Sequence, residues 1–262
     1  MQTYSPCYLK IKFFNDDTSN SGEVVHRIRR GETVRFNSQL HTATDQEIII
    51  YGGSNLKSIG NISNLNPSTM LIANAYKLTK LECHSTWLIT MDVSELTYLR
   101  EIDIEDCTKL GSDKQKVLNI SNCSYLTKVN AKNTQLTAIQ TNQSGGNLEE
   151  IYLPSSTTIV QLANQKNLKI IGLPYSKDGS VFPKNLATVS IINCPAIEKL
   201  NTSEDEEISN TFASFKYVQD LTLRNSLQLT EMNFKGFNKL KYVTLAAMST
   251  LTSLGFDDKA AD

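Results

Sequence analysis

The stretch Leu96-Thr-Tyr-Leu99-Arg-Glu-Ile102-Asp-Ile104-Glu-Asp-Cys107-Thr-Lys-Leu110 decides the fold of this chain. Two apolar residues separated by one position are followed, three residues later, by a small residue and, after three more, by another apolar residue. This phrase returns about every eleven residues along most of the sequence. The first residues of the apolar pairs form two interleaved series. One series is Ile48, Met70, Met91, Leu118, Ile139, Val160, Val189, Leu221 and Val243, and the other is Ile59, Leu81, Ile102, Val129, Ile151, Ile171, Leu200, Met232 and Leu254.

These apolar pairs predict short strands. Residues i and i+2 of a strand share one face, so each pair turns two apolar side chains inward. Eleven residues are too few for a strand, two turns and a helix. We therefore predict a mainly β chain, a right-handed solenoid of about nine coils of ~22 residues with two short parallel strand series. One coil cannot bury its own apolar face, whereas stacked coils share a continuous core.

The quoted stretch resembles the leucine-rich repeat, L-x-x-L-x-L-x-x-(N/C)-x-x-L, and Leu186-x-x-Val189-x-Ile191-x-x-Cys194-x-x-Ile197 resembles it equally well. The resemblance covers about residues 47–256 and implies a fold without implying one particular function. The chain lacks a regular Asn at the Asn/Cys position and repeats its short unit twice per coil. We therefore expect short strands or extended turns where other leucine-rich repeats carry helices.

The two ends of the chain depart from the repeat. Residues 1–46 contain an alternating stretch from Tyr8 to Phe14 and then a turn-rich segment, which predicts a small β-hairpin element that caps or docks on the 47–256 solenoid. The tail, residues 257–262, is too short to cover the last strand edge, so we expect a neighbouring subunit to cover it or the chain to be cut from something longer. The basic residues of the N-terminal element form either a docking surface for an acidic partner or a solvated face; they are Lys10, Lys12, Arg27, Arg29, Arg30 and Arg35.

Charge and cysteine content argue against a nucleic-acid-binding, membrane-binding or zinc-binding protein. The net charge of −1 creates no global field that would draw the chain to nucleic acid or membrane. The start lacks the pattern of a signal peptide and no apolar run reaches the ~20 residues of a membrane helix, so we expect synthesis in a cytoplasm or a leader that has been lost. Cys107, Cys123 and Cys194 occupy the small inward position of the repeat, and no cysteine spacing indicates zinc. We expect them to be reduced core thiols.

No catalytic constellation is visible. His26, His41 and His84 stand on unrelated units, and neither a nucleophile motif nor a phosphate-binding glycine loop occurs. The densest carboxylate group, at 101–106, fits a solvated strand face better than a glycosidic acid–base pair. The acidic run at 204–207 lacks the Asn and Gly residues of a calcium loop. We therefore expect no enzyme activity, no cofactor and no metal.

Three insertions interrupt both series together, at residues 111–116, 174–185 and 203–213. Equivalent positions of a solenoid fall on one edge, so the three loops are predicted to line one side, where binding residues tend to lie. The alternative is that they are tolerated surface insertions. The candidate binding residues are Tyr175, Lys177, Asp178, Phe182, Lys114, Lys116, Glu204, Glu206 and Phe212.

A further candidate is the set Tyr98, Tyr125, Tyr152 and Tyr242, which forms either a binding strip or a cover over apolar edges.

A repeat array of this kind builds a surface, so we expect a non-enzymatic scaffold for protein–protein binding. The style of the units resembles the leucine-rich-repeat proteins of gut bacteriophage virions, which occur in tail or neck assemblies. That resemblance implies a structural or receptor-contacting virion component, made in the host cytoplasm, with virion or surface proteins and a host receptor or glycan as partners. The alternative is a bacterial cell-surface adhesin resembling the BspA-like repeat proteins, which the Thr-, Ser- and Asn-rich outward positions also fit.

Overall fold

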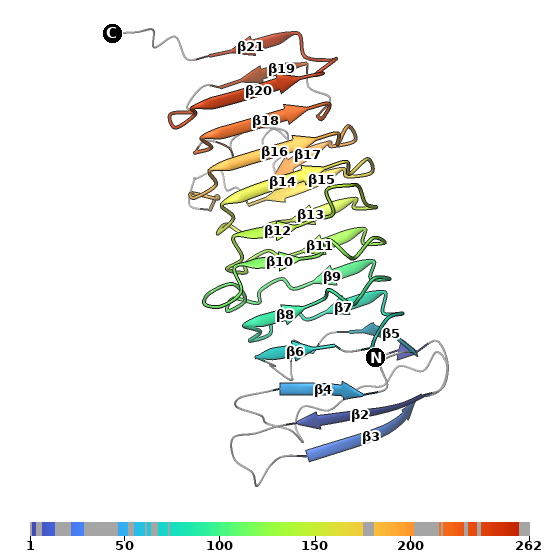
Figure 1. Cartoon of the computed structure of the whole chain (residues 1–262). Coiled ribbons are helices and arrows are strands. Elements are labelled where there is room, and N and C mark those ends of the chain that lie inside the picture. Colours follow the sequence, from blue (N-terminus) through green and yellow to red (C-terminus); the bar gives the residue numbers. More distant parts are fainter. Residues whose placement is uncertain are drawn as a thin grey trace. The chain divides into compact units, whose positions relative to one another are not determined.

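Strands make up nearly all the regular structure of this protein (Figure 1). The computed structural model describes residues 2–3, 7–13, 22–28, 47–51, 55–60, 62–63, 68–72, 74–174, 181–201, 215, 217–227, 230–234 and 237–256. Within these ranges no segment forms an α-helix. Nor does any described helix have the length and apolar character needed to cross a bilayer. The chain divides into two compact units, Met1–Gln140 and Thr141–Asp262.

The first unit contains three strand arrangements. One sheet has the order β3 (Gly22–Ile28), β2 (Cys7–Phe13), β4 (Glu47–Tyr51), β6 (Thr69–Leu71) and β8 (Thr90–Asp92). Here β2 pairs antiparallel with both β3 and β4, and the later strands are parallel. A second sheet has the order β1 (Gln2–Thr3), β5 (Leu56–Ile59), β7 (Lys80–Glu82), β9 (Glu101–Asp103) and β11 (Lys128–Asn130). Strands β10 (Val117–Asn119) and β12 (Ala138–Gln140) pair with each other. The hairpin of β2 and β3 therefore joins the edge of the parallel strands, while the domain boundaries expected from the sequence remain a prediction.

The second unit repeats the arrangement with longer strands in one series. Its largest sheet has the order β14 (Ile159–Ala163), β16 (Thr188–Ile192), β18 (Asp220–Arg224) and β20 (Tyr242–Ala246), all parallel. The interleaved strands are β13 (Glu150–Tyr152), β15 (Ile170–Leu173) and β17 (Lys199–Asn201), followed by the pair β19 (Glu231–Asn233) and β21 (Ser253–Gly255). All these pairs are parallel, as expected for stacked coils.

The strand registers confirm the two interleaved series within each unit. Ile59, Leu81, Ile102 and Val129 lie opposite one another across β5, β7, β9 and β11. Val160, Val189, Leu221 and Val243 do the same across β14, β16, β18 and β20. The second residues of the apolar pairs in the first series are also predicted to align in one inward column, from Ile50 to Leu245. Most of this column is buried, namely Ile72, Val93, Ile120, Leu162, Ile191 and Leu223. Leu245 is only half-buried, which corrects the prediction for that residue, and the side chain of Ile50 lies outside the described residues.

The buried cysteines are free thiols, as predicted for Cys107, Cys123 and Cys194, and Cys83 joins them. Cys7 has no described side chain. Burial raises the pKa of the Cys123 thiol to about 11 and also raises the pKa values of the other three, because the charged thiolate loses its hydration in the core. These thiols therefore stay protonated at neutral pH.

The turns after the strands use residues that tolerate a left-handed backbone. Asn164, Asn193 and Asn225 have φ of 57°, 54° and 44°, and each follows a strand of the β14–β16–β18 sheet. The Nδ2 of Asn193 donates to Oδ1 of Asn164 at 2.9 Å, and the Nδ2 of Asn225 donates to Oδ1 of Asn193 at 3.3 Å. These three residues form an asparagine ladder along one corner of the second unit. Asn is among the few L-residues that adopt this conformation readily.

The insertion at residues 111–116 is bridged by one side chain. The Oε1 of Gln115 accepts from the Met91 amide at 2.7 Å, and its Nε2 donates to the Met91 carbonyl at 2.7 Å. The side-chain amide thus bonds β8 as the peptide group of a neighbouring strand would. Gly111 begins the insertion with φ of +92°, and a Cβ there would come within 2.3 Å of the Gln135 backbone. Only glycine fits this close approach.

Candidate interaction surface

The C-terminal end of the second unit exposes the core. Val243 pairs in register with Leu221, but Val243 is 41% exposed and Leu221 only 1%. Leu254 pairs in register with Met232, and the same contrast holds, with 46% against 2% exposed. Both exposed residues occupy inward positions of the repeat, and no described strand lies beyond β20 or β21 in its sheet. Within the described residues, these inward side chains are therefore exposed to solvent.

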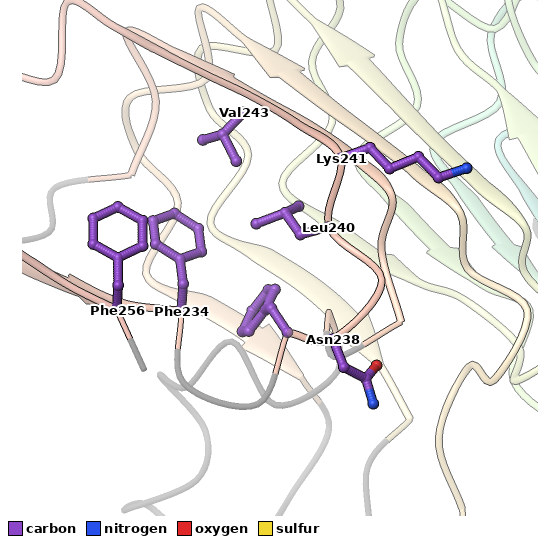
Figure 2. A pocket seen from close by; sticks show the side chains of 7 residues that line it. Phe234, Asn238, Leu240, Lys241, Val243 and Phe256 are labelled. Atoms are coloured by element: carbon purple, nitrogen blue, oxygen red, sulfur yellow. The ribbon is translucent and has the colours of Figure 1, made fainter. Parts of the chain in front are cut away.

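An apolar pocket of about 440 Å³ lies at this end. Figure 2 shows Phe234 and Phe256 with their rings side by side and Leu240 and Val243 facing the same space. The rings of Phe234 and Phe256 are stacked with centroids 5.4 Å apart, and Phe237 meets Phe234 edge-on at 5.5 Å. Phe234 is buried, whereas Phe256 is largely exposed. We call the residues that line this pocket, together with Leu254 and the outer edges of β20 and β21, the C-terminal end surface.

Polar groups border the pocket. Lys241 and Asn238 also line it, and both are exposed. In Figure 2 their polar ends point away from the phenylalanine rings. An apolar centre with a polar border is the usual composition of a protein–protein contact. The outer edges of β20 and β21 add backbone groups that can pair with another strand. The end surface can therefore bind an apolar side chain and extend a sheet.

The structure describes three of the candidate loop residues. Phe182 is half-buried and stacks on Tyr217 with centroids 5.2 Å apart. Lys184 lies over the Phe182 ring, and Lys239 over that of Tyr217. The Nζ of Lys116 donates to the carbonyls of Gly111 and Ser112, both at 2.7 Å, so it closes its own loop. Lys114 is exposed. The other candidates lie outside the described residues: Tyr175, Lys177, Asp178, Glu204, Glu206 and Phe212. Their alignment on one edge remains a prediction.

All four tyrosines of the candidate set lie within the described residues. Tyr98 and Tyr125 stack on each other with centroids 5.3 Å apart and planes 6° apart, and about half of each side chain is exposed. Tyr152 is half-buried and its hydroxyl donates to Oε2 of Glu150 at 3.2 Å. Tyr242 is 71% exposed and lies on β20. Of the four, Tyr242 alone is near the C-terminal end surface in sequence.

The carboxylates at 101–106 belong to a charged strand face. The Nζ of Lys80 lies 2.9 Å from Glu82 and 3.2 Å from Glu101, and Lys132 lies 3.9 Å from Glu105. Hydrogen bonds to Glu82, which has the larger effect, and to Glu101 raise the pKa of Lys80. The described residues contain no group of three or more His, Cys, Asp or Glu side chains placed to hold a metal ion. We call the outward side of β7, β9 and β11 the charged face.

The chain matches no family model, and no curated protein matches it. Among solved structures, an internalin (inlF) from Listeria monocytogenes has a TM-score of 0.22 and 12% sequence identity, with 78% of this chain and 72% of that chain covered.

The pocket itself was not predicted from the sequence. Phe234 and Phe256 are the second residues of the apolar pairs that begin at Met232 and Leu254, so the pattern turns both inward, whereas Phe237 stands outside the pairs. The available signal was that Phe234 and Phe256 stand 22 residues apart, one coil, at the same position of the repeat.

Proposed function

We propose that this chain is a non-enzymatic repeat scaffold that binds another protein through its C-terminal end surface. The observation that carries the proposal is the exposure of Val243 and Leu254 at positions whose partners one repeat earlier are buried. Exposed apolar patches with a polar border are typical of binding sites. A neighbouring subunit that presents an apolar strand or turn would cover the pocket and pair with the outer edge of β20.

The test is a charge placed at the centre of the surface. Val243→Asp should abolish assembly with the partner, because an aspartate would have to be buried without a counter-charge. The matched control is Val117→Asp on β10, since Val117 is also 41% exposed but lies on an outward strand face. Assembly is measured by light scattering coupled to size exclusion, with the wild-type chain alone and with candidate partner proteins. Equal assembly of the two variants would disprove the proposal.

We further propose that the assembly is a bacteriophage virion, in which the chain is a structural or receptor-contacting component of the tail, neck or fibre region. The resemblance of its units to virion leucine-rich-repeat proteins supports this assignment. The free thiols of the four described cysteines agree with synthesis in a reducing cytoplasm. Capsid and portal genes beside its gene would support it, as would mass-spectrometric detection of the chain in purified particles.

A bacterial surface adhesin is the second candidate. The uncharged outward positions of β16 and β20, which include Thr188, Ser190 and Thr244, favour it, because such side chains suit contact with neutral surface ligands. Neighbouring genes for secretion or sugar uptake, together with antibody labelling of intact cells, would support this candidate over the virion.

A further inference from the structure

The outward side of β14, β16, β18 and β20 carries a row of small polar side chains. Alternate residues of these strands face the core, and Val160 and Leu162 are both buried. The intervening residues Gln161, Ser190, Thr222 and Thr244 are paired in strict register from strand to strand. Adjacent strands lie about 4.8 Å apart, so this row repeats at that spacing across the sheet. We call it the polar row.

The hydrogen-bonding partners of the polar row can be examined only among the described residues. Among the residues that the structure describes, the side chains of Gln161, Ser190, Thr222 and Thr244 make no hydrogen bond. Asp220 and Arg224 flank Thr222 on β18, and they likewise make no ion pair within the described residues. They are separated by four residues and thus by about 13 Å along the strand. Six polar side chains therefore face one surface with their hydrogen-bonding capacity unused.

The charged face of the first unit shows the contrasting arrangement. Lys80, Glu101 and Lys128 occupy one row across β7, β9 and β11, so opposite charges alternate from strand to strand. Lys80 is bonded to both Glu82 and Glu101. Charged side chains of the charged face therefore pair with one another. The side chains of the polar row are mostly neutral and remain available to bond a ligand, which suits a neutral ligand rich in hydroxyl groups.

An exposed aromatic ring borders the polar row. Tyr242 lies opposite Asp220 in the register of β18 and β20 and is 71% exposed. An aromatic ring offers an apolar face on which the C–H side of a sugar ring can stack, while a carboxylate, a guanidinium and an amide bond its hydroxyls. A protein ligand would instead require a central apolar anchor site. The centre of this face holds Ser190 and Thr222.

We propose that this face of the second unit binds an extended neutral glycan lying across the strands. The advance per sugar in an extended pyranose chain is close to the strand spacing, so successive sugars would meet successive members of the polar row. Tyr242 stacks on one sugar, Asp220 accepts from hydroxyls, and Arg224 donates to ring or hydroxyl oxygens. This site is separate from the pocket between Phe234 and Phe256, and it does not depend on the proposed assembly.

The experiment titrates the full chain with β-1,4-linked hexasaccharides of glucose and of N-acetylglucosamine by isothermal calorimetry. Tyr242→Ala and Thr222→Val should each weaken binding by about tenfold or more, since one stacked ring or one hydrogen-bonded hydroxyl is lost. The matched controls are Tyr76→Ala and Thr97→Val, two exposed residues of the first unit, which should leave the affinity unchanged. Unaltered circular dichroism and melting temperature show that each variant is folded.

Three outcomes would overturn the proposal. The first is no heat of binding with either sugar at millimolar concentration. The second is binding that Tyr242→Ala and Thr222→Val leave unchanged. The third is capture of a protein that Thr222→Val releases while both sugars fail to bind, which would assign the face to a protein partner. The Val243→Asp variant separates the two proposals, because it should retain glycan binding while losing assembly.

Discussion

Leu221 and Val243 occupy the same position of successive repeats and lie opposite each other in the sheet, yet one is buried and the other is 41% exposed. The same contrast separates Met232 from Leu254. The sequence pattern thus determines which way a side chain points, whereas burial depends on the neighbours that pack against it. The interior of the second unit and its C-terminal end therefore carry the same kind of apolar side chain, but these side chains contribute less to stability at the end, where they are less buried.

The largest difference between the two regions should appear in core truncations. Leu223→Ala should lower the free energy of unfolding by about 2–5 kcal/mol, because it leaves a cavity in a fully buried column. Its register partner is Leu245, which is half-buried, and Leu245→Ala should cost about 1 kcal/mol or less. Urea denaturation at low protein concentration measures both. Equal losses would mean that the end is packed as tightly as the interior.

Thiol reactivity provides a second comparison. Cys194 follows β16 at the position that Met248 takes after β20, and Cys194 is buried whereas Met248 is half-buried. Burial raises the pKa of the Cys194 thiol, so at pH 8 it remains protonated and unreactive. A Met248→Cys variant should be alkylated about tenfold faster or more than Cys194. Peptide mapping after timed iodoacetamide treatment measures the two rates, and similar rates would contradict the model of an open end.

The asparagine ladder should show a smaller effect. Asn193→Ala should cost about 1–2 kcal/mol, because the side chain loses both ladder hydrogen bonds and alanine must adopt φ of 54°. Asn193→Gly keeps the backbone conformation and isolates the hydrogen-bond part. At the open end Ala247 has φ of 52°, so Ala247→Asn should stabilise the fold by about 0.5 kcal/mol. Thermal melts of the three variants test the ladder, and a destabilising Ala247→Asn would show that it does not extend to the end.

The smallest effect is expected on the charged face. Lys80→Met should change the free energy of unfolding by about 0.2–1 kcal/mol, because its ion pairs with Glu82 and Glu101 are half exposed to water. The effect should shrink at high salt. Lys114→Met, which removes an exposed lysine, is the control and should change nothing measurable. A loss as large as that of Leu223→Ala would mean that the surface contributes to stability as much as the core does.

The inward columns could be predicted from the sequence because their signal is local: each apolar pair identifies a strand and each eleven-residue step identifies the next. Registers such as Ile59 opposite Leu81 follow from these steps. The half-burial of Leu245 was missed because the inward column was predicted from the apolar pairs alone, without regard to the exposed last strand edge. The bond between Gln115 and Met91 could not be foreseen, since it depends on the path of an insertion with no repeat to align it.

The surface features depend on neighbours that are a coil apart in the chain. Asn164, Asn193 and Asn225 stand in equivalent turns, and aligning the turns as carefully as the strands would have revealed their ladder. The polar row required the same lateral alignment of Ser190, Thr222 and Thr244. Part of the pocket follows from the same alignment, because Phe234 and Phe256 end apolar pairs one coil apart, whereas Phe237 lies outside the repeat pattern.

The amide of Gln115 has a consequence for how such a chain can diversify. Repeats that pair strand to strand are intolerant of extra residues, because one added position shifts every later side chain to the opposite face. At residues 111–116 a single side chain replaces the missing strand contact, so the coil lengthens while the columns on either side keep their facing. A glutamine in such a place lets two repeats of unequal length remain hydrogen-bonded to each other. Between Gly111 and Gln115, the exposed residues 112–114 can change with little consequence for the core.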